Sequence, residues 1–266
     1  MTPTRILAAL ALSALSAIFT ASNADAQTAP VKAKNVVLIH GAWADGSSWG
    51  DVIPLLQKAG LHVTAVQNPL SSLADSNAAA KRALALQDGP TVLVGHSWGG
   101  TVVSDVGTDP KISALVYVAA RAPDADEDFV ALSGKFPTGP VRAGIQTYND
   151  YTLLSERAFL KDFANGVEPT KAKVLFAEQG DTATSIFAGR TTAAAWHDKP
   201  SFYAVAKQDR TINPDLERFL AKRMNATTVE VDGGHLIMVS HARQVANLIL
   251  QAAGITVPAN KTAMKK

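Results

Sequence analysis

The stretch of sequence that decides the fold is Thr91-Val-Leu-Val-Gly-His-Ser-Trp-Gly-Gly100. It begins as a short apolar run, continues into a Gly-x-Ser-x-Gly pattern centred on Ser97, and leads into residues of helical character up to about Val106. A nucleophile elbow requires a strand, a sharp turn and a helix in this order. Gly95 and Gly99 remove side chains that would collide with backbone in so tight a turn. The stretch therefore predicts a serine hydroxyl presented at the carboxyl end of a buried strand.

Strands and helices alternate on both sides of this elbow. Short apolar runs rich in β-branched residues are typical of strands that are buried on both faces of a parallel sheet. Strands are expected at residues 35–39, 61–66, 91–94, 112–120, 201–206 and 227–231, and helices at 49–59, 76–86, 99–106, 214–224 and 242–253. The alternation predicts an α/β fold with a doubly wound, mostly parallel sheet.

The alternation stops between about residues 121 and 199. This part contains an acidic turn at 124–128, a loop rich in glycine and proline at 133–144, and then segments of mostly helical character. We interpret residues 121–199 as a small helical cap that is inserted into the α/β domain. A chain of 266 residues can bury a sufficient core without disulfides, so residues 27–266 are expected to form one domain.

The N-terminus has the layout of a secretory signal peptide. Arg5 precedes an apolar stretch from Ile6 to about Phe19, and small residues then lead to Ala24-Asp-Ala26. This apolar stretch is shorter than the roughly 20 residues that span a bilayer as a helix. We expect cleavage after Ala26, a secreted or periplasmic protein, and no stable membrane anchor in the mature chain.

Composition excludes several classes of function. The formal net charge is only +2, and the 25 basic and 23 acidic residues are scattered along the chain, which argues against nucleic acid as a partner. The chain has no cysteine, so it has no thiol nucleophile and no thiolate ligand for a metal. Its six histidines lie apart, and no His-x-x-x-His pattern occurs. We therefore expect neither a metal site nor a cofactor.

A serine hydroxyl becomes a good nucleophile only when a base accepts its proton and an acid orients that base. In this type of fold the chain order is serine, acid, histidine. His235 lies just beyond the strand expected at 227–231 and is the predicted base. Asp209 follows the strand expected at 201–206 and is the predicted acid, because functional groups gather at the carboxyl ends of strands in doubly wound sheets. His96, inside the elbow, is expected to be a packing residue.

Three more carboxylates are also candidates for the acid. Asp232 lies only three residues before His235, although a role in shaping the turn fits its position better. Asp124 and Glu127 follow an earlier strand, where some hydrolases place their acid.

Attack on an ester creates an oxyanion that needs hydrogen-bond donors placed in advance. The backbone N–H of Trp98, directly after the nucleophile, is one predicted donor. The N–H of Ala42, in the loop after the first strand, is the other candidate. Gly41 lets the backbone approach closely there, and His40 is expected to be a buried structural histidine bonded to loop backbone.

Taken together, these motifs resemble those of an α/β-hydrolase over residues 35–253. The residues that carry the resemblance are His40-Gly-Ala-Trp43, Gly95-His-Ser-Trp-Gly-Gly100, Asp209 and His235. The His-Gly-Ala-Trp opening and the short cap are similar to the branch that holds plant methyl esterases, hydroxynitrile lyases and many bacterial carboxylesterases. The resemblance implies that residues 27–266 form an α/β-hydrolase domain.

The same resemblance narrows the expected chemistry. Lyases of that branch place a threonine after the first histidine and a lysine after the catalytic one, whereas this chain has Gly41 and Leu236. Epoxide hydrolases and haloalkane dehalogenases carry an aspartate where this chain has Ser97. The resemblance therefore implies esterase chemistry.

We expect a serine esterase that cleaves a small, fairly apolar carboxylic ester through an acyl-enzyme, with the substrate under the cap. Two alternatives stay open, namely perhydrolysis of the kind carried out by cofactor-free haloperoxidases, and a low-turnover binding protein on the same fold. The aromatic residues expected to contact the substrate are Trp43, Tyr148, Tyr151, Phe159, Phe163, Phe187 and Trp196.

Overall fold

The computed structural model describes residues 32–256, so the predicted signal peptide lies outside the described residues. Six parallel strands form the central sheet in the order β2-β1-β3-β4-β8-β9. Their bounds are β1 Asn35–Ile39, β2 His62–Val66, β3 Thr91–His96, β4 Ile112–Val118, β8 Ser201–Ala206 and β9 Thr227–Val231. The predicted doubly wound, parallel sheet is confirmed.

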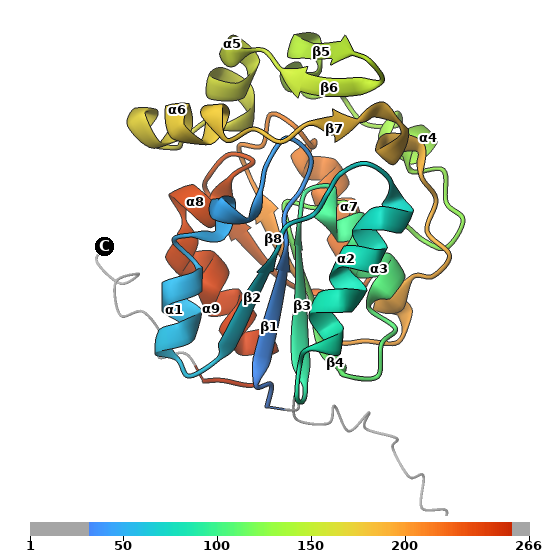
Figure 1. Ribbon diagram of the computed structural model, residues 1–266, viewed down its shortest axis with the longest axis vertical. Helices are drawn as coiled ribbons and strands as arrows, with labels where there is room; N and C mark the ends of the chain where they lie inside the picture. The colour runs from blue at the N-terminus through green and yellow to red at the C-terminus, as the bar shows by residue number, and fades with distance from the viewer. Residues whose placement is uncertain (1–31, 257–266) are drawn as a thin grey trace, which may run out of the picture.

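The inner strands have more apolar sequences than the outer ones because they are buried. Every residue of β1, β3 and β8 is buried, in keeping with their continuous apolar sequences. The outer strands β2 and β9 are partly exposed and more polar. Helices cover both faces, with α1 and α9 on one side and α2 and α3 on the other (Figure 1), while α7 packs against β8.

The helices of the α/β part follow the predicted order with shifted ends. The helix expected at 49–59 is split into a 3-10 turn, η1, and a shorter helix that has a proline in its first turn. The helix expected at 76–86 starts earlier, because the Ser72 hydroxyl caps it by accepting from the Asp75 N–H at 3.0 Å. The bounds are η1 Gly46–Trp49, α1 Ile53–Lys58, α2 Leu73–Ala85, α3 Gly99–Val106, α7 Pro214–Arg223, α8 Ile237–Ser240 and α9 Ala242–Ala252. Within residues 32–256 no helix is long and apolar enough to cross a membrane.

The insertion between β4 and β8 lies over the carboxyl ends of the central strands (Figure 1). It contains helices, as expected, and also an antiparallel three-stranded sheet in the order β5-β6-β7 that the sequence pattern did not indicate. These strands have only two to four residues, too few for an alternating pattern to be recognised. The bounds are α4 Phe129–Ser133, η2 Pro140–Gly144, β5 Ile145–Tyr148, β6 Tyr151–Leu154, α5 Glu156–Ala158, η3 Phe159–Phe163 (a π-helical turn), α6 Pro169–Ala177, β7 Thr182–Ala183, η4 Thr184–Ala188 and η5 Ala195–His197.

Candidate active site

Ser97 occupies the sharp turn between β3 and α3, in a left-handed backbone conformation with φ of +52°. A side chain is excluded on both sides of it. A Cβ atom at Gly95 would lie 2.7 Å from a methyl carbon of Val103, and one at Gly99 would lie 2.7 Å from the Ile39 carbonyl oxygen. The strained turn and the two glycines are the features predicted for a nucleophile elbow.

The three residues predicted to act together lie in one hydrogen-bonded chain. The His235 Nε2 is 2.8 Å from the Ser97 Oγ, and the His235 Nδ1 is 2.6 Å from the Asp209 Oδ2. Asp209 comes from the segment after β8 and His235 from the segment after β9, so neighbouring strands deliver them to the same edge of the sheet. The side chains of His235 and Asp209 are fully buried.

The hydrogen bonds around Asp209 define what each atom can do. Its Oδ1 accepts the backbone N–H groups of Thr211 and Ile212 at 2.6 and 2.9 Å, which stabilise the carboxylate. Its Oδ2 accepts the Nδ1–H of His235, which leaves the Nε2 of that ring to accept the Ser97 proton. The arrangement is able to generate a nucleophilic alkoxide at Ser97.

Asp232, although close to His235 in the sequence, points away from it. Its Oδ1 accepts a hydrogen bond from the Gln208 amide at 2.9 Å and lies 3.7 Å from the Lys207 ammonium nitrogen. The Asp232 side chain is 69% exposed, unlike that of Asp209. It therefore belongs to the turn before His235.

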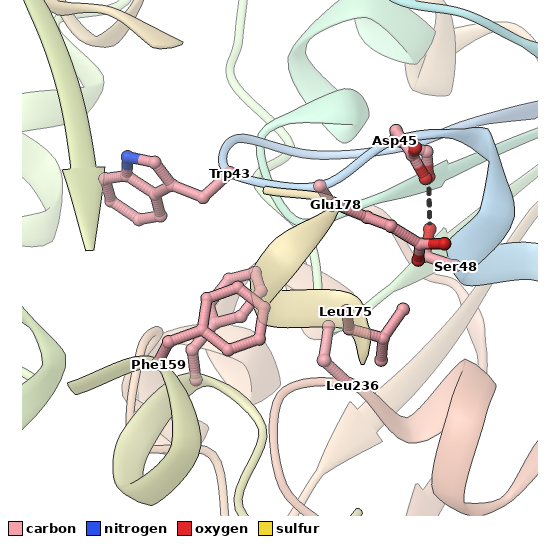
Figure 2. A pocket seen from close by; sticks show the side chains of 9 residues that line it. Trp43, Asp45, Ser48, Phe159, Leu175, Glu178 and Leu236 are labelled. Carbon is pink, nitrogen blue, oxygen red and sulfur yellow. Dashed lines mark hydrogen bonds between the residues drawn. The ribbon is translucent and has the colours of Figure 1, made fainter. Parts of the chain in front are cut away.

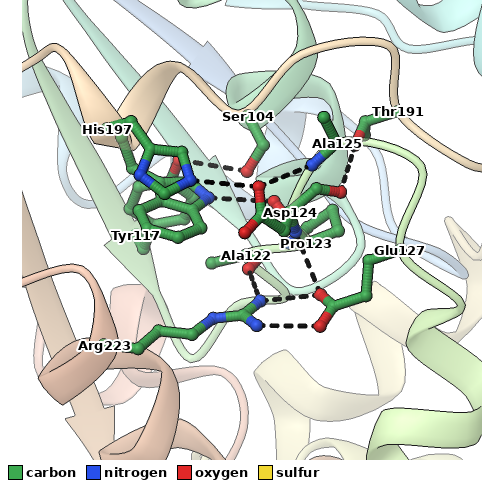
Figure 3. Close-up of polar contacts among 11 residues, drawn as sticks. Ser104, Tyr117, Ala122, Pro123, Asp124, Ala125, Glu127, Thr191, His197 and Arg223 are labelled. Carbon is green, nitrogen blue, oxygen red and sulfur yellow. Dashed lines mark hydrogen bonds and ion pairs between the residues drawn. The ribbon is translucent and has the colours of Figure 1, made fainter.

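Asp124 and Glu127 belong to a polar cluster with His197 and Arg223 (Figure 3). The Asp124 Oδ1 is 3.0 Å from the His197 Nε2. Glu127 accepts two hydrogen bonds from Arg223, both at 2.8 Å, and these bonds lower the pKa of its carboxyl. Since both carboxylates already have these partners, the geometry favours Asp209 as the partner of His235.

The loop after β1 packs directly against Ser97. A Cβ atom at Gly41 would lie only 2.6 Å from the Ser97 Cβ. His40 holds this loop as expected, because its Nδ1–H donates to the Gly41 carbonyl at 3.0 Å and its Nε2 accepts the Asn68 N–H at 2.8 Å. Burial lowers the pKa of His40, which favours this neutral form.

The two predicted oxyanion donors flank the same serine. Trp98 follows it directly, and Ala42 follows Gly41. Across the part of the chain that the structure describes, neither backbone N–H donates to another protein group. Both amides are therefore free to bind an oxygen that develops charge next to Ser97.

His96 is hydrogen-bonded to the backbone of His235. It is fully buried, and its Nε2–H donates to the His235 carbonyl oxygen at 3.1 Å. Burial holds the pKa of His96 well below its usual range, and the neighbouring His235 lowers it further. The residue is therefore neutral near pH 7 and acts in packing, as predicted.

A pocket is lined by side chains of the cap and by Leu236, the residue after the predicted base (Figure 2). The ring of Phe163 lies 5.1 Å from that of His235, and Leu236 is the next residue in the chain. The cavity volume is about 10 Å³, which is room for roughly one water molecule. The lining consists of Trp43, Ala44, Asp45, Ser48, Phe159, Phe163, Leu175, Glu178 and Leu236.

Three of the aromatic residues predicted to contact substrate, Trp43, Phe159 and Phe163, line this pocket. The lining does not include the other four, which are Tyr148, Tyr151, Phe187 and Trp196, and contact with substrate stays a prediction for all seven residues.

Local contacts explain why these four side chains do not line the cavity. The Tyr148 side chain is exposed and donates to Asp181 at 2.6 Å, and the neighbouring Tyr151 packs within the cap. Phe187 contacts the Trp43 ring at 5.4 Å without reaching the cavity. Trp196 contacts the segment before Asp124, since its indole N–H donates to the Pro123 carbonyl oxygen at 2.9 Å.

The sequence did not predict that polar and aliphatic residues would line the pocket. Leu175 is on α6 and Glu178 directly follows this helix, whereas Asp45 and Ser48 belong to the loop and 3-10 turn after β1. No spacing in the sequence connects these two segments, so only the tertiary structure reveals that they face each other.

Glu217 is a second buried carboxyl group near Asp209. Glu217, on α7, is fully buried, and its Oε2 accepts the Ala206 N–H at 2.9 Å. Burial raises the pKa of Glu217 well above its usual range, and the negative charge of Asp209 raises it further. Glu217 therefore stays a neutral carboxylic acid at pH values where an ordinary glutamate is already ionised.

This neutral acid predicts an unusual pH dependence of stability. Between the pKa of an unfolded glutamate, about 4.3, and the raised pKa of Glu217, the folded protein binds one more proton than the unfolded chain. The contribution of Glu217 to the free energy of unfolding should therefore fall by about 1.4 kcal/mol per pH unit across this window. In E217Q, glutamine keeps the acceptor for Ala206 and loses the titration. Urea unfolding at pH 4 and pH 7 should show E217Q losing less stability than the wild type.

E156Q, which changes an exposed glutamate on α5, controls for the removal of one carboxyl group. A wild-type advantage over E217Q that grows with pH would contradict the assignment, because it would mean that the Glu217 side chain is ionised and stabilising.

Two known proteins are similar to this chain in sequence. The chain is 27% identical over 227 residues to methylesterase 2 of Arabidopsis thaliana, covering 74% of this chain and 86% of that protein. It is 32% identical over 117 residues to a carbendazim hydrolyzing esterase of Nocardioides sp. (strain SG-4G), covering 38% of this chain. The chain spans about half the length of that second relative, 48%.

Solved structures show the same fold. Polyneuridine aldehyde esterase superposes with a TM-score of 0.72 at 20% identity, covering 82% of this chain and 98% of that one. A pyrethroid hydrolase from Sphingobium faniae JZ-2 gives a TM-score of 0.70 at 20% identity, covering 85% and 99%. The sequence profile of the alpha/beta hydrolase family matches residues 36–248. This match spans most of the chain and includes Ser97, Asp209 and His235, so the chain belongs to the alpha/beta hydrolase family.

Proposed function

We propose that this protein is a serine esterase that hydrolyses small carboxylic esters. The observation that carries the proposal is the buried chain of hydrogen bonds from Ser97 through His235 to Asp209, at 2.8 and 2.6 Å. It lies at the base of a cap and beside two free backbone N–H groups. The names of the relatives, an esterase and a methylesterase, support the same chemistry.

The reaction follows from the positions of these atoms. The His235 Nε2 takes the proton from Ser97 as the Oγ attacks the ester carbonyl carbon. The resulting oxyanion accepts hydrogen bonds from the N–H groups of Ala42 and Trp98, each typically worth about 3 kcal/mol. When the C–O bond to the alcohol breaks, His235 returns the proton to the leaving oxygen. Water, deprotonated by His235, then attacks the acyl-enzyme and releases the carboxylic acid.

The pocket favours a neutral and largely apolar substrate. Phe159, Phe163, Leu175 and Leu236 supply apolar surface, while Asp45 and Glu178 add negative charge at the same pocket. An anionic ester would be repelled by these two carboxylates.

Substrate entry requires the pocket to widen, because its present volume of about 10 Å³ is too small for an ester. Ala172 and Leu175 of α6 are buried, whereas the polar contacts that tie the α6 end of the cap to the core are exposed. They are the Lys171–Asp51 ion pair and the hydrogen bond from the Ser47 hydroxyl to Glu178 at 3.0 Å. Exposed pairs of this kind contribute little stability, about 0–1 kcal/mol, so we propose that the cap opens on this side.

The test is turnover of p-nitrophenyl acetate and butyrate by the purified protein, compared with p-nitrophenyl hemisuccinate, which carries an added carboxylate. We expect many turnovers per chain and a kcat/KM for the neutral esters that exceeds that for the anionic one. Release of a single equivalent of nitrophenol would favour a low-turnover binding protein instead. Faster formation of peracid than of carboxylic acid, with acetate and hydrogen peroxide present, would favour perhydrolysis.

A further inference from the structure

One segment of the cap is bonded to the loop that carries the Ala42 N–H. The backbone N–H of Trp43, the next residue, donates to the Thr182 hydroxyl at 2.9 Å, and the Trp43 indole N–H donates to the Thr152 hydroxyl at 3.1 Å. Figure 2 shows the indole nitrogen turned away from the other pocket side chains. Thr152 and Thr182 are paired residues on β6 and β7, far from Trp43 in the sequence.

The direction of these hydrogen bonds is fixed. The Thr182 hydroxyl donates its only proton to the Gly180 carbonyl at 3.3 Å, and the Thr152 hydroxyl donates to the Thr182 carbonyl at 3.1 Å. Each hydroxyl therefore meets Trp43 as an acceptor. Both threonines are buried, with 0% exposure for Thr182 and 4% for Thr152. Water therefore does not replace either hydroxyl as an acceptor for the Trp43 N–H groups.

The same cap segment also contacts the other side of the elbow. The indole N–H of Trp98 donates to the Ile186 carbonyl oxygen on η4 at 3.0 Å. Residues 182–186 thus bond to Trp98, whose own N–H is one predicted oxyanion donor, and to Trp43, which follows the second predicted donor. One short stretch of the cap braces both halves of the candidate oxyanion hole.

We propose that the cap segment Thr182–Ile186 positions the oxyanion hole, with Thr182 as the main positioning residue; this inference rests on the esterase function proposed above. Trp43 has a left-handed backbone with φ of +56°, a conformation that a non-glycine residue keeps only when its surroundings enforce it. The hydrogen bond to Thr182 enforces it. When the Thr182 hydroxyl is lost, the peptide group before Trp43 rotates so that its N–H reaches another acceptor. This rotation moves the Ala42 N–H, one residue earlier, away from the oxyanion.

The consequence is that the cap has two ends with different roles. The β7–η4 end is bound to the elbow and the oxyanion loop by buried hydrogen bonds, whereas the polar contacts of the α6 end are exposed. The oxyanion hole therefore stays assembled while the α6 end opens for substrate.

The experiment compares T182V, which keeps the shape of the side chain and removes the hydroxyl, with T182S, which retains the hydroxyl. T147V is the matched control, because Thr147 pairs with Thr152 in the same small sheet but is exposed. For p-nitrophenyl butyrate we expect T182V to lower kcat by about 10- to 100-fold with KM changed less than about threefold, since small misplacements of a donor cost this much. T182S should recover most of the rate, and T147V should match the wild type.

A transition-state analogue separates positioning from a general structural role. An aryl trifluoromethyl ketone forms a hemiketal with the serine whose oxyanion occupies the hole. Its inhibition constant should rise in T182V by the same factor by which kcat/KM falls, with Tm above the assay temperature in all variants. An increase in KM at unchanged kcat, or an unchanged inhibition constant, would overturn the proposal while leaving the esterase function intact. Absence of turnover in the wild type would instead reject the esterase function itself.

Discussion

Replacing Ser97 by alanine is expected to lower kcat/KM for p-nitrophenyl butyrate by on the order of 10⁴- to 10⁶-fold, the range found when the nucleophile of a serine hydrolase is removed. The reason is chemical, since the His235 Nε2 loses the proton donor that it meets at 2.8 Å and no acyl-enzyme forms. The residual rate comes from the oxyanion donors and the pocket alone. The measurement is the initial rate at substrate concentrations well below KM.

S104A is the matched control for this variant. Ser104 is also buried, lies on α3 just after the elbow, and bonds to the Tyr117 hydroxyl at 3.1 Å. Its replacement removes a buried hydroxyl without touching His235, so kcat/KM should stay within a few-fold of the wild type. A loss of less than tenfold in S97A would contradict the assignment of Ser97 as the nucleophile.

The second large effect is expected for D209N, with a fall in kcat of about 10⁴-fold. Asparagine keeps an acceptor for the N–H groups of Thr211 and Ile212, so the geometry is preserved. Its amide, however, donates to the His235 Nδ1 and fixes the wrong tautomer, in which the Nε2 carries the proton and is unable to accept one from the serine. The loss should appear in kcat more than in KM.

D232N and D124N serve as controls for D209N. The sequence alone excludes neither aspartate as the acid, and both are bonded to groups outside the catalytic chain in the structure. Each variant should keep kcat within about threefold of the wild type. A loss in either variant that equals the loss in D209N would mean that the histidine is oriented by a different carboxylate than the one at 2.6 Å.

The elbow and its partners were predictable because each is marked by a short pattern in the sequence. Gly95, Ser97 and Gly99 lie within five residues, and the strands that deliver Asp209 and His235 are marked by runs of apolar residues. Parallel strands end at one edge of the sheet, so the order of the elements was enough to bring these side chains together.

The cap and the pocket were less predictable because their contacts connect distant segments. Trp43 and Thr182 are 139 residues apart, and β7 has two residues. Glu217 was missed for a different reason. In the sequence it is an acidic residue in the first turn of a helix, a position where an exposed carboxylate is usual, and only the structure shows it buried behind Asp209.

The most direct test of the account is covalent labelling with a fluorophosphonate followed by peptide mass spectrometry. An activated serine should react once per chain, and the adduct should lie in the tryptic peptide 83–111, on Ser97 and not on Ser104. S97A should remain unlabelled, and D209N should react far more slowly than the wild type. An adduct on another residue, or equal labelling of S97A and the wild type, would contradict the claim that Ser97 is the nucleophile of this hydrolase.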